Sequence, residues 1–221
     1  MPTQKIRLYH YWRSSSSWRV RWAFAIKGIV YEPVAVDILS GEVDLPEHLK
    51  RNPLGYLPVI EFLGDGEIGR YPFLFESMAI IEWAEEEYPA EPLLPGSSRD
   101  RAWVRQLAEI INAGTQPLQN VGVMDLHSSD PGQKKAWASH WIRKGLGAYE
   151  QILASRPDLR STRFSCGDKV TLADLYLIPQ CYNALRFSIA LEEFPKIHQI
   201  YLAALQTPGY LASEPERFKT V

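Results

Sequence analysis

The 221-residue sequence has only two cysteines, Cys166 and Cys181, and they do not form a CxxC pair. No cluster of Cys and His has the spacing of a zinc site, so we predict no metal site. Both cysteines are interpreted as buried, inert thiols, because free cysteine behaves as a small apolar residue.

Long apolar segments and an excess of one charge are lacking too. No segment approaches the roughly 20 apolar residues that a membrane-spanning helix needs. The 24 basic and 26 acidic side chains give a net charge of −2, which argues against a nucleic-acid partner, since phosphate contacts need clustered positive charge. Residues 1–7 lack the apolar core of a secretory signal. We therefore expect a cytoplasmic protein with no membrane and no nucleic-acid partner.

What is present is a globular composition, 46% apolar and 23% charged. Up to about Tyr88, strand-like segments alternate with helix-like ones, in the order βαβαββα. A helix over 17–27 is expected to end at Gly28, and Ser77 is placed to cap the last helix of this half. The expected strands cover residues 6–11, 31–36, 57–62 and 72–75, with Gly64-Asp65-Gly66 as the hairpin turn between the last two.

The second half has few strand signals. Three prolines within residues 89–97 favour an extended linker. Beyond it, apolar residues recur at helical spacing, Thr171 and Asp174 form a capping box, and Pro195 suits the first turn of a helix. We predict a domain over 1–88, a linker over 89–97, and an all-helical domain over 98–221.

Four consecutive serines, Ser14 to Ser17, lie where the first strand ends and the first helix begins. Backbone N–H groups and the positive end of the helix dipole converge there, which favours a phosphate, a carboxylate or a thiolate. Alternatively, one serine caps the helix and the others fill a polar loop. A thiol acting at this turn must come from a ligand, because the turn contains no cysteine.

Two further segments are candidates for ligand binding. Leu57-Pro58 begins a predicted strand, and a cis bond there would leave the Leu57 backbone to pair with an extended peptide-like ligand; an ordinary trans turn is the alternative. Glu76-Ser77 begins a helix, so it offers a second anion site, although capping alone also explains Ser77.

The serine turn, Leu-Pro and Glu-Ser, in this order and followed by a helical half, resemble glutathione transferases. That family has an α/β thioredoxin-like N-terminal domain and an all-α C-terminal domain. The resemblance is closest to the zeta class, the maleylacetoacetate isomerases. The segments that carry it are Ser14–Arg21, Lys27-Gly28, Asn52-Pro53, Ala79–Glu82, Gln116–Asn120, Gly167–Asp174 and Pro179-Gln180.

The resemblance implies roles for individual residues. Ser14 and Ser15 would be catalytic, at the glutathione sulfur. Arg186 would hold a substrate carboxylate, for which its planar fork is suited; a surface ion pair is the alternative. Gln116 and Asn120, expected on the first long helix of the second domain, would line the shared cleft. The residues expected to bind glutathione are Ser16, Ser17, Leu57, Glu76, Ser77, Gln116 and Asn120.

The implied activity is glutathione-dependent cis–trans isomerisation of a conjugated keto acid, of the maleylacetoacetate or maleylpyruvate type, with glutathione transferase activity. The implied setting is aromatic amino acid catabolism, and the implied assembly a homodimer. Two alternatives stay open: a general transferase that conjugates small electrophiles, and a non-catalytic glutathione-fold binding protein. Three departures from the family pattern are Ser16 in place of cysteine, Glu42-Val43 in place of glutamine, and a longer hairpin over residues 61–75.

Overall fold

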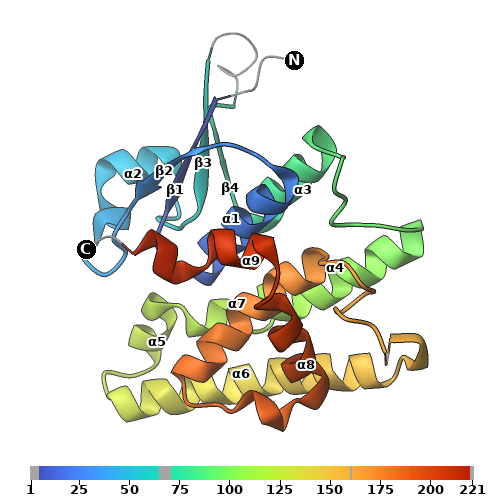
Figure 1. Ribbon diagram of the computed structural model, residues 1–221. Coiled ribbons are helices and arrows are strands. Elements are labelled where there is room, and N and C mark those ends of the chain that lie inside the picture. Colours follow the sequence, from blue (N-terminus) through green and yellow to red (C-terminus); the bar gives the residue numbers. More distant parts are fainter. Residues whose placement is uncertain (1–4, 65–70, 160, 220–221) are drawn as a thin grey trace. The chain divides into compact units, whose positions relative to one another are not determined.

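The computed structural model describes residues 5–64, 71–159 and 161–219 (Figure 1). The chain forms two compact units, one of Met1–Glu91 with Pro208–Val221 and the other of Pro92–Thr207. The sequence predicted a helical domain running to residue 221, whereas the segment from Pro208 onward groups with the first unit. No helix within the described ranges is both long enough and apolar enough to cross a membrane.

The first unit contains a four-stranded sheet of order β2-β1-β3-β4. Strand β1 runs parallel to β2 and antiparallel to β3, and β4 is antiparallel to β3. One row of the register joins Tyr9, Val59 and Phe75 across three strands. The strands are β1 (Lys5–His10), β2 (Glu32–Ala35), β3 (Val59–Leu63) and β4 (Phe73–Phe75). The predicted strand order along the chain is confirmed; the Gly64-Asp65-Gly66 turn lies largely outside the described residues.

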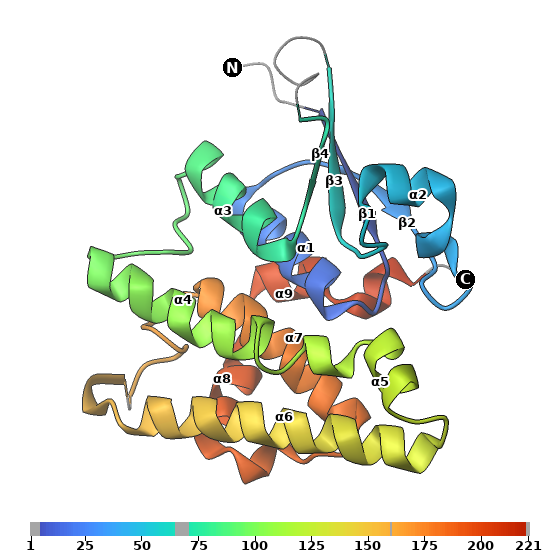
Figure 2. The same cartoon turned by 180° about the vertical axis from the view of Figure 1, so that it is seen from behind.

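The helices of this unit pack on both faces of its sheet. Helices α1 and α3 lie on one side and α2 on the other (Figures 1 and 2). Gly28 ends α1 in the left-handed region, at φ 67°, as the sequence predicted. The bounds are α1 (Ser15–Lys27), η1 (Glu42–Asp44), α2 (Pro46–Arg51), α3 (Ser77–Glu87), α9 (Pro208–Ser213) and η6 (Pro215–Phe218).

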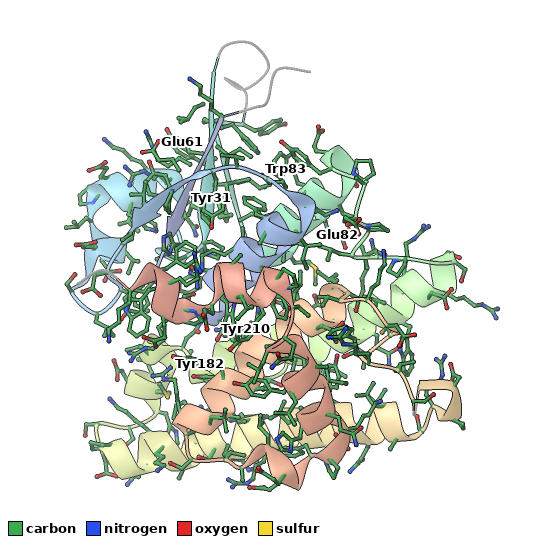
Figure 3. All side chains as sticks on the ribbon, viewed as in Figure 1. Tyr31, Glu61, Glu82, Trp83, Tyr182 and Tyr210 are labelled. Carbon is green, nitrogen blue, oxygen red and sulfur yellow. The ribbon has the colours of Figure 1, made fainter. Side chains whose placement is uncertain are left out.

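Helix α9 packs on α1 through aromatic side chains. The centroid of the Tyr210 ring lies 5.3 Å from that of Trp18 and 5.8 Å from that of Trp22, both edge-on; Tyr210 is labelled in Figure 3. Trp18 also donates from Nε1 to the Ser213 hydroxyl at 3.1 Å. The last described segment of the chain is thus part of the core that supports α1.

The second unit is helical throughout its regular elements. Helix α7 is buried from Leu172 to Cys181 and packs against α4, α6 and α8. The predicted capping box at Thr171 and Asp174 is confirmed, and Pro195 stands in the first turn of α8. The bounds are α4 (Ser98–Asn112), η3 (Pro117–Gln119), α5 (Val121–His127), α6 (Pro131–Ala154), η4 (Pro157–Leu159), α7 (Leu172–Arg186), η5 (Leu191–Glu193) and α8 (Pro195–Ala204). An α/β thioredoxin-like unit and an all-α unit are what the sequence predicted.

Candidate active site

The serine turn begins helix α1. Ser14 is the N-cap, in extended conformation, and its Oγ accepts the backbone N–H of Ser17 at 3.2 Å. Ser14, Ser15 and Ser16 are half-buried, whereas Ser17 is completely buried. The side chains of Ser14, Ser15 and Ser16 are therefore partly accessible, whereas the side chain of Ser17 lies in the core. The predicted contact of Ser17 with a ligand stays a prediction.

Arg21 holds the segment that leads into this turn. Its guanidinium donates to the carbonyl oxygens of Tyr11 at 3.3 Å and Trp12 at 2.9 Å, and to that of Ser213 at 3.2 Å. Burial lowers the pKa of Arg21 to about 10, so it keeps its charge at neutral pH. These hydrogen bonds hold the backbone of the residues between β1 and Ser14 in place.

His10 completes this buried cluster. Its Nδ1 lies 3.3 Å from Nη1 of Arg21, and since the guanidinium is only a donor, Nδ1 accepts. Burial, together with the neighbouring Arg21 charge, lowers the pKa of His10 to about 4. His10 is therefore neutral at physiological pH. Residue-type rules predict no buried role for Arg21, because a charged side chain is ordinarily expected at the surface.

The Leu57–Pro58 bond is cis, which is one of the two alternatives that the sequence left open. The segment before it is anchored by α2: the Tyr56 carbonyl lies 3.2 Å from Nε2 of His48 and accepts from Nδ2 of Asn52 at 3.0 Å. Both anchoring side chains are buried. Leu57 itself is half-buried, which leaves part of this segment accessible.

Ser77 is the first residue of α3 rather than its cap, contrary to the sequence prediction, because the N-cap is Glu76. Glu76 has φ 68°, a left-handed conformation that a non-glycine residue seldom adopts and that concentrates at functional sites. The Ser77 hydroxyl accepts a hydrogen bond from Nη1 of the fully buried Arg19 at 3.3 Å. A positive charge thus lies directly behind the start of this helix.

The serine turn, Leu57-Pro58 and Glu76-Ser77 all lie at one edge of the sheet. Tyr9 near the end of β1, Val59 at the start of β3 and Phe75 at the end of β4 share one register row. Neighbouring strands lie about 4.8 Å apart, so the row spans about 10 Å. The segments that follow or precede this row carry Ser14, Leu57 and Ser77, so the three candidate segments begin at the same end of the sheet.

The remaining predicted residues belong to the second unit. The prediction that Gln116 and Asn120 lie on the first long helix of this unit is wrong. Both lie in the turn after that helix, where Nε2 of Gln116 donates to Oδ1 of Asn120 at 2.7 Å. Arg186 is the exposed last residue of α7, and its Nη1 donates to Oδ1 of Asn183 at 3.0 Å.

The chain's own thiols are poor nucleophiles. Burial raises the pKa of Cys166 to about 12 and raises that of the fully buried Cys181 as well. Neither cysteine is in a disulfide. Within the part of the chain that the structure describes, no group of three or more His, Cys, Asp or Glu residues is placed to hold a metal ion.

Comparison with known proteins identifies the family. Residues 8–92 match the family described as glutathione S-transferase, N-terminal domain. A protein of Euphorbia esula named "Glutathione S-transferase zeta class" is 39% identical over 216 residues, which cover 96% of this chain and 91% of that protein. The chain belongs to the zeta-class glutathione S-transferases. The resemblance read from the sequence motifs is thereby confirmed.

Solved structures of this class have the same fold. The maleylacetoacetate isomerase of Anaeromyxobacter dehalogenans, solved with glutathione in its active site, superposes with a TM-score of 0.86 at 44% identity, over 98% of each chain. The same enzyme was solved with dicarboxyethyl glutathione and citrate in the active site. A zeta-class maleyl pyruvate isomerase superposes with a TM-score of 0.86 at 35% identity, over 95% of this chain and 96% of that one.

Proposed function

We propose that this zeta-class protein is a glutathione-dependent cis–trans isomerase of a conjugated keto acid, of the maleylacetoacetate or maleylpyruvate type, with glutathione transferase activity. The observation that carries the proposal is the row of Ser14, Leu57 and Ser77 segments at one sheet edge. Two solved relatives named isomerases support it, and one of them was solved with glutathione in its active site.

The donor set at this edge fits glutathione. Glutathione is an extended tripeptide with a thiol in its middle residue and a free α-carboxylate at its γ-glutamyl end. Ser77 and the N–H groups that begin α3 would bind that carboxylate, favoured by the helix dipole and by Arg19. The Leu57 backbone would pair with the cysteinyl residue, and Glu76 with the γ-glutamyl amine.

At the serine turn, the Ser14 hydroxyl accepts from Ser17 N–H and so keeps its own hydrogen for donation. Ser14 and Ser15 would direct hydroxyl hydrogens at the glutathione sulfur, and Ser16 would add a polar contact. Each pKa unit removed from a thiol corresponds to about 1.4 kcal/mol of thiolate stabilisation. When bound, glutathione supplies the thiolate that adds reversibly to the double bond and so permits rotation. The chain's own thiols stay protonated near neutral pH.

Arg186 of the helical unit is proposed to select the keto acid by binding a substrate carboxylate through its planar fork. Gln116 and Asn120 would supply amide contacts to glutathione. The dicarboxyethyl glutathione in the active site of the Anaeromyxobacter enzyme carries two carboxylates more than glutathione. That ligand is consistent with a site that accepts an acidic carbon chain together with glutathione.

We also propose that the protein works as a cytoplasmic homodimer in the breakdown of aromatic amino acids, as the class resemblance implies. A reducing compartment suits an enzyme that uses reduced glutathione. Sedimentation of the purified protein would test the dimer, and a single monomeric species at micromolar concentration would contradict it.

The proposed activity is tested by comparing substrates. Purified protein is mixed with maleylacetoacetate or maleylpyruvate, with and without glutathione, and the loss of the cis isomer is followed by absorbance. We expect turnover only with glutathione, at a kcat/KM well above that for conjugation of a chlorinated dinitrobenzene. Faster conjugation than isomerisation would favour the general transferase, and binding of glutathione without any turnover would favour the binding protein.

A further inference from the structure

Two segments of the helical unit are joined by a buried pair of amides. Gln119 in η3 and Gln180 in α7 exchange two hydrogen bonds, from Nε2 of Gln119 to Oε1 of Gln180 at 3.2 Å and from Nε2 of Gln180 to Oε1 of Gln119 at 3.1 Å. Gln119 is 7% exposed and Gln180 fully buried. The two motifs Gln116–Asn120 and Pro179-Gln180, 61 residues apart at this pair, therefore meet in space.

All four hydrogen-bonding positions of the Gln119 amide are used. Its second N–H donates to the Thr115 carbonyl at 2.9 Å, and its oxygen also accepts from Nδ2 of Asn183. Packed apolar side chains often stabilise a core as well as a buried polar network does. A closed network instead fixes the orientation of every member, since each misplaced amide would leave a buried group unpaired.

The outer end of the network reaches Arg186. Asn183 and Arg186 both lie in the last turn of α7. Its Nδ2 donates to Gln119, so its Oδ1 is turned to accept from Nη1 of Arg186 at 3.0 Å. Flipping the Asn183 amide would place an N–H against the guanidinium and an oxygen against the Gln119 oxygen. The bond to Gln119 therefore orients the Asn183 amide so that its oxygen, and not its N–H group, faces Arg186.

The inner end of the network is the turn that carries Gln116 and Asn120. The Leu118 carbonyl in this turn accepts from Nε1 of Trp137 at 2.8 Å. Thr115 is fully buried and donates to the Ile110 carbonyl at 2.7 Å. Because the turn is anchored on α4 and α6, the network transmits a fixed position from it to the end of α7.

We infer that Asn183, oriented by the Gln119–Gln180 pair, is a positioning residue that fixes Arg186 for a substrate carboxylate. The network thereby sets the preference of the site for an acidic substrate over a neutral electrophile. This inference rests on the proposed function, in particular on the carboxylate contact of Arg186.

The test compares KM values for two substrates. We expect Asn183→Ala and Gln180→Met each to raise KM for maleylpyruvate roughly tenfold, because a displaced binding group loses its alignment. The KM for glutathione and the conjugation rate with a chlorinated dinitrobenzene should change less than twofold. Gln151→Met, at an exposed position of α6, is the matched control and should change none of these values.

Asn183→Asp is a second variant that keeps the shape of the side chain. Its carboxylate would pair with Arg186 and compete with the substrate, so KM for maleylpyruvate should again rise while the dinitrobenzene rate stays. In an Arg186→Ala background, Gln180→Met should raise KM for maleylpyruvate no further, because the arginine through which it acts is gone.

The outcomes separate the two claims. If Arg186→Ala raises KM for maleylpyruvate but Asn183→Ala, Asn183→Asp and Gln180→Met do not, the positioning role is overturned and the proposed function stands. If Arg186→Ala leaves that KM unchanged, the carboxylate contact and the positioning role both fail. If Asn183→Ala and Gln180→Met impair activity equally with maleylpyruvate and with the chlorinated dinitrobenzene, the positioning role is overturned and the network has a structural role only.

Discussion

Ser14 has one observed task, capping α1, and one proposed task, donation to the glutathione sulfur, and a single hydroxyl can perform both. It caps α1 by accepting from Ser17 N–H, and a hydroxyl that accepts can still donate its own hydrogen. The cap fixes where that hydroxyl stands, since its oxygen must stay within reach of Ser17. The donor proposed for the sulfur is therefore held in place by the helix that it begins.

Replacing Ser14 by alanine should remove the cap and the proposed donor together, and their losses affect different measurements. Loss of the cap costs about 1 kcal/mol of stability, and loss of the donor should lower kcat by at least about tenfold while glutathione affinity stays nearly unchanged. Steady-state kinetics measures kcat, and a glutathione titration measures the affinity.

Ser97→Ala is the matched control, because Ser97 caps α4 in the same way. It should cost similar stability and leave kcat unchanged. Equal losses of glutathione affinity and kcat in Ser14→Ala would point to a purely binding role for Ser14.

His10 makes the stability of the first unit depend on pH. Its pKa is about 4, against an ordinary value of 6.5. Between these values the unfolded chain binds a proton that the folded chain does not, so stability falls as pH decreases from about 6.5 to about 4. The full effect is about 3 kcal/mol. His10→Gln keeps an acceptor for Arg21 without titrating, and should flatten this dependence.

Urea unfolding at pH 7 and at pH 4.5 measures the difference. His140→Gln, which removes an exposed histidine, should keep the wild-type pH dependence. The same loss of stability on acidification in wild type and His10→Gln would contradict the assignment.

At the scale of elements, two of the three glycines in α6, Gly145 and Gly147, differ in the space around them. A Cβ on Gly145 would lie 2.0 Å from Oγ1 of the buried Thr115, whereas a Cβ on Gly147 would meet only Phe194, at 4.0 Å. Gly145 is therefore needed for the close approach of α6 to the turn that carries Gln116 and Asn120.

Alanine at these two positions should change stability in opposite directions. Gly145→Ala should lower the free energy of unfolding by about 1–3 kcal/mol through overpacking. Gly147→Ala should raise it by up to about 1 kcal/mol, because alanine favours a helix. Denaturant unfolding measures both free energies. An unchanged free energy of unfolding in Gly145→Ala would show that Thr115 can move away from the added Cβ.

Local rules predicted the elements well wherever a residue type decides the backbone, as at Gly28 and at Thr171 with Asp174. They were wrong at two helix ends. Ser77 is a good capping residue, yet the cap is Glu76, whose left-handed backbone no residue-type rule would choose. Gln116 and Asn120 were placed on a helix although Pro117 stands between them, and a proline disfavours helix continuation across it.

At the scale of the whole molecule, the return of α9 to the first unit was outside the reach of sequence patterns. Tyr210 is 7% exposed and contacts two tryptophans of α1. Tyr210→Ala should destabilise the protein by about 3 kcal/mol, as is usual for a buried aromatic residue. Leu211→Ala, at a residue 49% exposed, should cost much less. Thermal unfolding compares the two variants, and an equal loss of stability in both would contradict the packing of Tyr210 against α1.

The site was predictable in its parts and not in its assembly. Ser14, Leu57 and Ser77 are marked by helix starts and a proline, which the sequence shows. Their alignment depends on the register of Tyr9, Val59 and Phe75, which is fixed by pairing across the sheet. The burial of Arg19 and Arg21 depends on what packs around α1, including residues about 190 positions later in the chain.

The bond from Arg21 to the carbonyl of Ser213 also bears on the order of events during synthesis. Ser213 is synthesised 192 residues after Arg21. The Arg21 guanidinium therefore gains this partner only after the whole helical unit, Pro92–Thr207, has been synthesised. A nascent chain that stalls within the helical unit contains Ser14 to Ser17 but lacks the carbonyl that completes the hydrogen bonds of Arg21.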